Sequence, residues 1–163
     1  MIFKVILGDI TKLDSDVEAI VNAANSSLLG GGGVDGAIHR AAGPELLKEC
    51  RTLGGCNPGD AKVTRAYDLK QKYIIHTVGP IYYLDKNPPE TLKSCYLKCL
   101  QLADALGVKK IAFPSISTGV YAYPVEDAAK IAVSVIKDYH PKNIEEVIMV
   151  AFDKRTYDAY QKQ

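Results

Sequence analysis

Two glycine-containing segments have the composition of anion-binding loops. Residues 30–36 read Gly-Gly-Gly-Gly-Val-Asp-Gly, and residues 115–121 read Ser-Ile-Ser-Thr-Gly-Val-Tyr. Consecutive glycines let the backbone approach a ligand and turn its N–H groups inward. A helix that follows such a loop adds partial positive charge at its N-terminus. Together the two segments predict a site that holds a diphosphate from opposite sides. The alternatives are a flexible surface loop and an ordinary Ser-Thr-Gly turn.

Polar and aromatic residues at predicted strand ends could recognise the rest of a nucleotide. Asn22 and Asn25 lie three residues apart, and an amide side chain, which donates and accepts, can bind a sugar diol. Asp9 could accept a hydrogen bond from the exocyclic amine of a base, and Phe152 could stack on that base. Each has a simpler alternative: a turn for the asparagines, a turn cap for Asp9 and core packing for Phe152.

Other enzyme signatures are incomplete. Residues 31–36 formally match G-x-G-x-x-G, but no second strand with an acidic residue follows at Rossmann spacing. A Gly-Lys-Ser/Thr triplet is absent, and Ser115 and Ser117 lack the G-x-S-x-G pattern of a nucleophile elbow. His76 lies inside an apolar run, which favours a hydrogen-bonded core histidine over a general base. These observations argue against NAD binding and covalent hydrolysis.

Composition excludes further classes. The chain has 163 residues, 20 basic and 19 acidic side chains, a net charge of +1 and 47% hydrophobic residues. A nucleic-acid-binding protein usually has a clear basic excess, although a local patch for RNA is conceivable at Lys70, Lys72, Lys109 and Lys110. No apolar run is long enough to span a membrane. We expect one domain over residues 1–163, without a signal peptide, cytoplasmic and monomeric.

The four cysteines do not have the spacing of a zinc site. Cys95 and Cys99 lie four residues apart on an apolar helical face, which indicates core packing. Reduced thiols are expected for a cytoplasmic protein. The sequence therefore predicts no metal and no cofactor.

Hydrophobic patterns predict alternating strands and helices. Strands are expected at 2–7, 17–21, 61–67, 73–78, 110–115 and 146–152. Helices are expected from about Asp35 with that residue as N-cap, from Pro44, over 92–106, from Pro124 to Tyr139, and over 155–161. This order predicts a three-layer α/β/α sandwich with a mixed, mostly parallel central sheet. Ligands bind such sheets beyond the carboxyl ends of the strands.

Five segments resemble, in order, motifs of the macrodomain family and of its MacroD-type class. From the N-terminus they are Gly-Asp-Ile-Thr at 8–11, Asn-Ala-Ala-Asn at 22–25, Gly-Gly-Gly-Val-Asp-Gly-Ala-Ile-His at 31–39, His-Thr-Val-Gly-Pro at 76–80 and Ser-Thr-Gly-Val-Tyr at 117–121. The resemblance covers nearly the whole chain. It implies a single macrodomain that binds ADP-ribose.

The resemblance also implies roles for individual residues. Asp9, with Ile10 beside it, would accept from the adenine amine, and Phe152 would stack on the adenine. Asn22 and Asn25 would orient the distal ribose. One side of the diphosphate and distal ribose would be lined by Gly33, Val34 and the amides around Asp35 and Gly36. The diphosphate would be held from the other side by Ser117, Thr118, Gly119, Val120 and Tyr121.

Asp35 distinguishes hydrolysis from binding alone. Family members with an aspartate at this position resemble hydrolases that remove ADP-ribose from modified Asp and Glu side chains and deacetylate O-acetyl-ADP-ribose. We therefore expect Asp35 to orient or deprotonate a water near the distal ribose while Asn25 fixes the sugar. The alternative is a module that binds ADP-ribose without turnover.

The sequence departs from the family pattern at two places. Position 122 is alanine where the family often has glycine, so a positive φ there would carry an energetic cost. Residues 55–59, Gly-Cys-Asn-Pro-Gly, also differ from the commoner pattern, which we expect to alter a turn rather than the chemistry.

Overall fold

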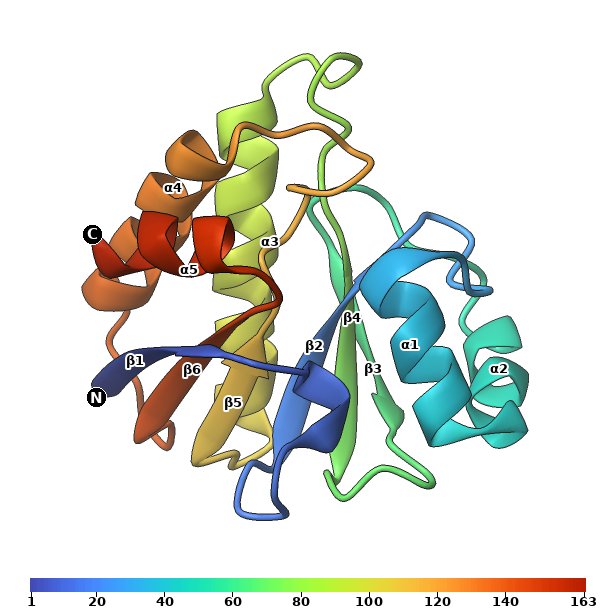
Figure 1. Cartoon of the computed structure of the whole chain (residues 1–163). Coiled ribbons are helices and arrows are strands. Elements are labelled where there is room, and N and C mark those ends of the chain that lie inside the picture. Colours follow the sequence, from blue (N-terminus) through green and yellow to red (C-terminus); the bar gives the residue numbers. More distant parts are fainter.

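The computed structural model, which describes residues 1–163, contains one six-stranded sheet of order β1-β6-β5-β2-β4-β3 (Figure 1). All neighbouring strands are parallel except β3, which runs antiparallel to β4 at the edge. The strands are β1 Ile2–Leu7, β2 Ala19–Ala24, β3 Ala61–Arg65, β4 Tyr73–Val78, β5 Lys110–Phe113 and β6 Glu146–Ala151.

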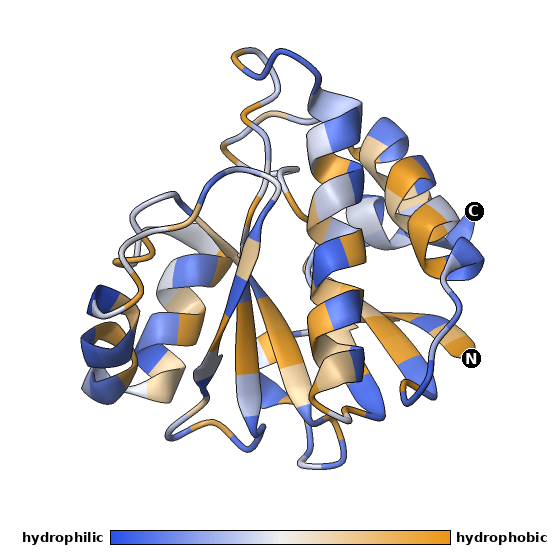
Figure 2. Cartoon of the chain, turned by 180° about the vertical axis from the view of Figure 1, so that it is seen from behind, coloured by the Kyte–Doolittle hydropathy of each residue, from blue (hydrophilic) through white to orange (hydrophobic).

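Helices cover both faces of the sheet and close two hydrophobic cores of 25 and 17 buried residues. The larger core lies beneath α3 Pro88–Ala105, α4 Val125–Asp138 and α5 Lys154–Gln161. The smaller lies beneath α1 Gly33–Ala42, α2 Pro44–Arg51 and the 3-10 helix η1 Ile10–Lys12. Figure 2 shows the strands hydrophobic over most of their length and the helices mixed, as expected when a sheet is buried on both faces. The predicted three-layer α/β/α sandwich is confirmed.

The elements differ from the predicted boundaries in three informative places. Strand β2 begins at Ala19 and continues through Asn22, so this asparagine lies inside the strand rather than after it. Helix α3 begins at Pro88, because proline suits the first helical position. Helix α1 begins at Gly33 with Gly32 as N-cap, so the prediction that Asp35 caps it is wrong. The Asp35 carboxylate is instead drawn inward by a hydrogen bond from Asn22.

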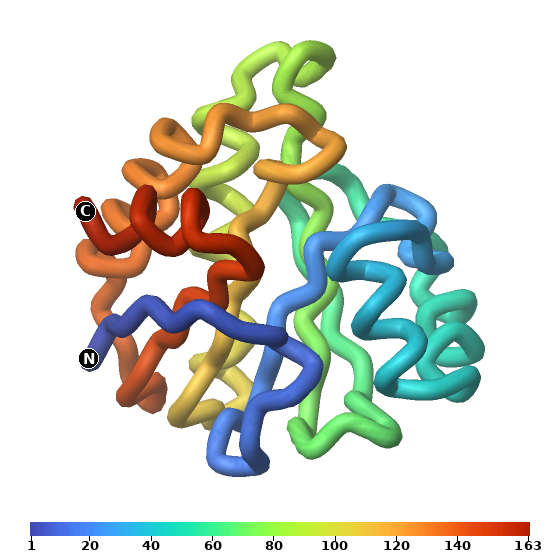
Figure 3. The backbone as a smooth tube through the Cα atoms, viewed as in Figure 1, coloured from blue at the N-terminus to red at the C-terminus, as the bar shows by residue number.

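The sheet topology brings the predicted site segments to one end. From β5 the chain continues to β6, toward the β1 edge of the sheet. From β2 it continues to β3, at the opposite edge, so the direction of the connections reverses between β5 and β2. Ligands bind at such switch points in open α/β sheets. These two strands pair only through Ala19 with Ile111 and Ile20 with Ala112, at the amino end of β2. In Figure 3 the loops after β2 and β5 both extend beyond the same end of the sheet.

None of the helices has the length and apolar character required to cross a membrane.

Candidate ligand-binding and catalytic site

The first glycine segment folds into a tight loop that enters α1. A Cβ on Gly36 would lie 2.6 Å from the carbonyl oxygen of Gly31, so only glycine permits this approach of loop and helix. Gly33 has a φ of +58°, a conformation that glycine adopts without strain. The backbone N–H groups of residues 31–35 donate to no group in the chain. They are the free donors of a helix N-terminus and can accommodate an anion.

The second segment, which follows β5, offers a matching set of free donors. The backbone N–H groups of residues 117–121 also donate to no group in the chain. The Thr118 hydroxyl instead bonds to the Ser115 carbonyl oxygen at 3.1 Å and to the Ser115 hydroxyl at 2.8 Å. The backbone amides, rather than the Thr118 hydroxyl proton, are therefore the donors available to a diphosphate.

Close packing fixes the conformation of this second loop at Ser117. Ser117 has a φ of +68°, and its Oγ is buried without a hydrogen-bond partner. A Cβ added to Gly79, just beyond β4, would collide with that oxygen. Gly79 is therefore required for the loop after β5 to pack against the end of β4.

Two buried tyrosines support the second loop from below. The Ile116 N–H donates to the Tyr96 hydroxyl of α3 at 3.1 Å, and the Ser115 hydroxyl lies 2.8 Å from the Tyr160 hydroxyl of α5. The two tyrosine hydroxyls are 3.4 Å apart. Burial raises the pKa of both Tyr96 and Tyr160, which keeps these hydroxyls protonated. The loop is thus held by helices on the face of the sheet opposite to α1.

Asp35, in the first turn of α1, has one oxygen held and the other free. Its Oδ1 accepts a hydrogen bond from Asn22 Nδ2 at 2.8 Å and lies 3.5 Å from His39 Nε2. Its Oδ2 accepts no hydrogen bond from the chain, although the residue is only 5% exposed. Burial raises the pKa of Asp35, while the Asn22 hydrogen bond and His39 partly oppose that rise. A carboxylate with a raised pKa is a better base near neutral pH.

Residues of both loops lie near Asp35. Burial raises the pKa of Tyr121, and the negative charge of Asp35 contributes to the same rise. Asn25 is also close to Asp35, because a Cβ placed on Gly31 would meet Asp35 Oδ2 at 3.2 Å and Asn25 Nδ2 at 3.3 Å. The structure thus places Asn25 and Asp35, both predicted at the distal ribose, near Tyr121, which was predicted to hold the diphosphate.

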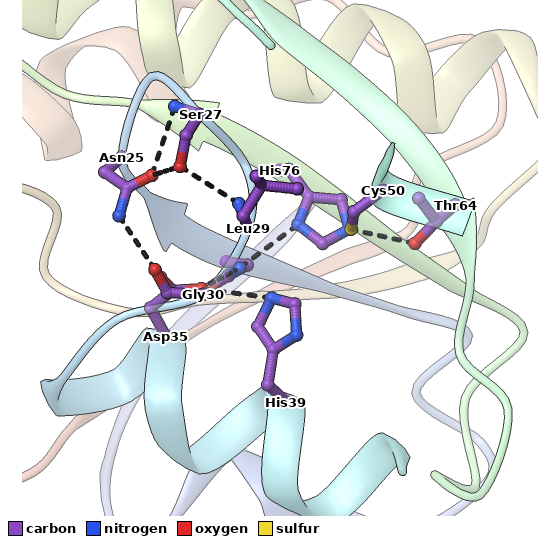
Figure 4. A network of polar contacts seen from close by, with 10 residues as sticks. Asn25, Ser27, Leu29, Gly30, Asp35, His39, Cys50, Thr64 and His76 are labelled. Carbon is purple, nitrogen blue, oxygen red and sulfur yellow. Dashed lines mark hydrogen bonds and ion pairs between the residues drawn. The ribbon is translucent and has the colours of Figure 1, made fainter. Parts of the chain in front are cut away.

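The Asn25 side chain organises its own loop. Its Nδ2 donates to the Gly30 carbonyl oxygen at 2.9 Å, and its Oδ1 accepts from the Ser27 N–H at 3.1 Å and the Ser27 hydroxyl at 2.6 Å (Figure 4). The predicted turn role of Asn25 is therefore present. Asn25 can also contact a sugar, because the residue is half-buried and its Nδ2 donates one hydrogen bond within the chain.

Asn22 does not have the predicted exposure. It is 0% exposed, and its Nδ2 donates both to Asp35 Oδ1 and to His76 Nδ1, the latter at 3.1 Å. A direct contact between Asn22 and a sugar conflicts with this burial. Its position inside β2, rather than beyond the strand, is the physical reason. Asn22 acts on the site through Asp35.

The predicted adenine-binding residues lie where β1 and β6 end side by side. The Gly8 N–H donates to the Ala151 carbonyl oxygen at 2.9 Å, which places Asp9 and Phe152 at the same edge. Phe152 is 86% exposed, so the core-packing alternative for it is wrong. Ile10 is buried, and only its backbone can face a base.

Asp9 caps η1 and keeps one oxygen free. Its Oδ1 accepts from the Thr11 hydroxyl at 2.6 Å and from the Thr11 N–H at 2.9 Å. The hydroxyl bond, followed by the N–H bond, lowers the pKa of Asp9, so the carboxylate is charged. Its Oδ2 accepts no hydrogen bond from the chain and is available to an exocyclic amine.

The interpretation of His76 as a hydrogen-bonded core histidine is confirmed. It is 0% exposed and lies 2.8 Å from the Thr64 hydroxyl. Burial, with a contribution from His39, lowers the pKa of His76 to about 3. The sequence patterns did not single out Thr64 or the contact of His76 with Asn22. Both arise from strand pairing between segments far apart in the chain.

The four cysteines are free and buried, and no cluster of three or more His, Cys, Asp or Glu side chains is arranged to hold a metal ion.

The chain is similar over most of its length to proteins of known family. The macro domain family model matches residues 21–132. The chain is 52% identical to O-acetyl-ADP-ribose deacetylase 1 of Pantoea vagans, covering 97% of this chain and 95% of the relative. It is also 52% identical to ADP-ribose glycohydrolase MACROD2 of Xenopus laevis, covering 96% of this chain but 38% of that protein.

Solved structures agree with the sequence similarity. The Oceanobacillus iheyensis macrodomain with ADP superposes with a TM-score of 0.92 at 44% identity, over 97% of this chain and 87% of that one. The Trypanosoma brucei macrodomain in complex with ADP-ribose gives 0.89 at 42% identity, over 97% and 68%. The glycine loop before α1, the loop after β5 and the matching fold have a common explanation: the chain belongs to the macro domain family.

Proposed function

We propose that this protein binds ADP-ribose and hydrolyses the ester that joins it to modified Asp and Glu side chains of proteins, and that it deacetylates O-acetyl-ADP-ribose. One observation carries the proposal: Asp35 presents a free oxygen beside two loops of unpaired backbone N–H groups. The names of the relatives from Pantoea vagans and Xenopus laevis support the same class of reaction.

The loops provide binding without cationic side chains. The N–H groups of residues 31–35 and 117–121 hold the diphosphate from two sides, aided by the N-terminus of α1. At the adenine end, Phe152 stacks on the base and Asp9 Oδ2 accepts from its amine. Gly33, Val34 and Gly36 line one side, and Val120, which is 91% exposed, lines the other.

Asp35 provides the catalytic step. Its Oδ2 accepts a proton from a water molecule while that water attacks the ester at the distal ribose, and Asn25 orients the sugar. The ester bond breaks, the proton held by Asp35 passes to the departing ribose oxygen, and ADP-ribose and a carboxylic acid are released. Positioned general-base catalysis of this kind contributes about 10²–10⁴-fold in rate.

The alternative is a binding module without turnover. The unpaired amides suffice to hold the ligand and do not require Asp35 to act as a base. A hydrolase is distinguished from a binding module by incubating the protein with a glutamate-ADP-ribosylated protein and, separately, with O-acetyl-ADP-ribose. The release of ADP-ribose and of acetate is then measured. Measurable ADP-ribose affinity with no release from either substrate would refute the hydrolase.

Two variants separate binding from turnover. Asp35→Ala is expected to retain most ADP-ribose affinity and to lose turnover. Phe152→Ala is expected to weaken ADP-ribose binding by about 1–3 kcal/mol, the usual contribution of one base–aromatic stack. Because Phe152 is 86% exposed, its removal leaves the core intact, and an unchanged melting temperature serves as the control. Unchanged affinity in Phe152→Ala would remove this residue from the site.

A further inference from the structure

We propose that His76 is a positioning residue for the reaction: it holds Asp35 through Asn22, in a buried chain of hydrogen bonds that begins at Thr64. This series of hydrogen bonds crosses three neighbouring strands, β3, β4 and β2, and ends on α1 (Figure 4). The inference rests on the proposed function of Asp35. It goes beyond that function because it assigns a role to residues that touch no ligand.

The register of the strands brings the hydrogen-bonded residues together. Asn22 and His76 are direct partners in the β2–β4 pairing, and Thr64 lies on β3 opposite Ile74, two residues from His76. All three side chains lie on the face of the sheet covered by α1 and α2. Each is nearly or fully inaccessible to solvent, at 0% for Asn22 and His76 and 2% for Thr64.

The hydrogen-bond partners fix the direction of every proton. The Thr64 hydroxyl donates to the Arg65 carbonyl oxygen at 2.9 Å, which uses its one proton. His76 Nε2 must therefore carry a hydrogen and donate to Thr64 Oγ1 at 2.8 Å. This leaves His76 Nδ1 as an acceptor for Asn22 Nδ2 at 3.1 Å. The second hydrogen of the same amide goes to Asp35 Oδ1 at 2.8 Å.

This arrangement restrains the Asn22 amide. If the amide rotated by half a turn, its oxygen would face both the Asp35 carboxylate and the lone pair of His76 Nδ1. Two acceptors thus select one orientation, and that orientation holds Asp35 Oδ1 while leaving Oδ2 free. Removing the acceptor at His76 would relax the amide and, with it, the carboxylate.

His76 itself has no acid–base or nucleophile-activating role. The titratable groups that face it are His39, whose ring centroid is 6.5 Å away, Cys50, and Asp35 through Asn22. Cys50 Sγ lies 4.0 Å from Nε2, and burial, followed by nearby carboxylates, raises the pKa of Cys50 to about 11. A neutral imidazole beside a neutral thiol does not form a thiolate–imidazolium pair, so the contribution of His76 is geometric.

The first test compares two substitutions at His76. His76→Leu removes the acceptor and is expected to lower kcat about 10–100-fold, the range known for loss of the hydrogen-bond partner that orients a metal ligand, with little change in KM. His76→Asn places an amide oxygen near the position of Nδ1 and is expected to restore kcat to within about threefold of wild type. The acid limb of the pH profile should move upward in His76→Leu only, because Asp35 then loses a donor that stabilises its charged form.

Thr77→Val provides the matched control. Thr77 is the next residue in β4, is 0% exposed and points to the opposite face, where its hydroxyl donates to the Asp60 carbonyl oxygen at 2.8 Å. This variant loses a buried hydrogen bond of the same strand and should lower stability without moving the pH profile. An equal change of kcat and pH profile in Thr77→Val and His76→Leu would reduce His76 to a structural residue and overturn the proposal.

A second measurement does not depend on turnover or on a folded variant. Nitrogen chemical shifts of the wild-type imidazole should show a neutral ring with hydrogen on Nε2 from pH 5 to pH 8, and a carboxyl titration should show Asp35 above its ordinary pKa. Hydrogen on Nδ1 would overturn the proposed series of hydrogen bonds even if the enzyme were active. If wild type shows the Nε2–H ring but no hydrolysis, the proposed function fails while the hydrogen-bond chain stands.

Discussion

Two carboxylates of this protein are almost equally buried but accept very different numbers of hydrogen bonds. Asp104, at the end of α3, is 7% exposed and accepts from the Tyr139 hydroxyl at 2.6 Å and from three successive backbone N–H groups, those of residues 142–144, at 2.8–3.0 Å. Asp35 is 5% exposed and accepts one hydrogen bond from the chain.

The number of donors decides the charge preference of each carboxylate. Burial raises the pKa of both groups, but at Asp104 the hydrogen bonds outweigh burial and hold the pKa below the ordinary value of 3.8. At Asp35 burial prevails, and the pKa is raised. A carboxylate with both oxygens occupied fastens a loop, whereas one with a free oxygen and a raised pKa can take a proton. The comparison predicts different losses on substitution.

The largest effect is expected for Asp35→Asn. Turnover should fall about 10²–10⁴-fold, because the amide cannot act as a base. Stability at pH 7 should rise, because a buried charge with too few donors is replaced by a neutral group. Single-turnover kinetics and urea unfolding of the same preparation measure both quantities. Wild-type turnover in this variant would remove Asp35 from the mechanism.

Asp104→Asn should show the reverse pattern. An amide cannot accept all four hydrogen bonds, and its NH₂ group opposes a donor, so the free energy of unfolding should fall by about 2–4 kcal/mol. The kcat of the folded fraction should match wild type, because the Asp104 carboxylate binds residues 142–144 just before β6 begins, whereas the site loops follow the carboxyl ends of the strands. A loss of kcat at full folding would contradict the division between the two carboxylates.

The two groups should also have opposite effects on the pH dependence of stability. The folded-state pKa of Asp104 is lowered, so its stabilisation is fully present above pH 3.8 and is lost as the pH falls through its folded pKa. The folded-state pKa of Asp35 is raised, so its destabilisation at neutral pH is relieved as the pH falls toward 3.8.

Urea unfolding between pH 7 and pH 3 can resolve both signs. The stability gain of Asp35→Asn over wild type should shrink on acidification, and the stability deficit of Asp104→Asn should shrink only at the lowest pH values. A gain in Asp35→Asn that does not depend on pH would show that the Asp35 pKa is not raised.

The smallest effect is expected at Ala122, which directly follows the second loop and has a φ of +62°. An L-residue in this region is strained, whereas glycine is not, so Ala122→Gly should stabilise the fold. After the greater freedom of glycine in the unfolded chain is subtracted, the net gain is about 0.5–1 kcal/mol. Thermal unfolding measures it, and Ala37→Gly in the middle of α1 should instead destabilise.

Much of the fold followed from the sequence because hydrophobic periodicity is local. Helices α3 and α4 and the buried strand β4 carried clear patterns, and five of the site segments were recognisable as motifs. The departure from glycine at position 122 also proved relevant, because Ala122 has the positive φ at which alanine carries an energetic cost. The strand order placed these segments together at the carboxyl ends, as the topological rule predicts.

The errors concern contacts that no local pattern contains. Asp35 looked like a helix cap because its neighbours in sequence suit one, but Asn22, thirteen residues earlier, draws it inside. Asn22 looked like a ligand-facing residue because the strand was expected to end at Val21. Thr64 and His76 lie twelve residues apart and meet only because β4 runs back antiparallel to β3.

The unpaired amides of residues 31–35 and 117–121 have a consequence for observing the site. Backbone N–H groups without acceptors exchange their hydrogen with water quickly, even where the surrounding strands and helices are rigid. In this protein they form two short fast-exchanging stretches beside slow-exchanging neighbours. A bound anion would slow exchange at the amides it contacts. The hydrogen exchange rate of each amide would then show which residues of the two loops contact the bound phosphates.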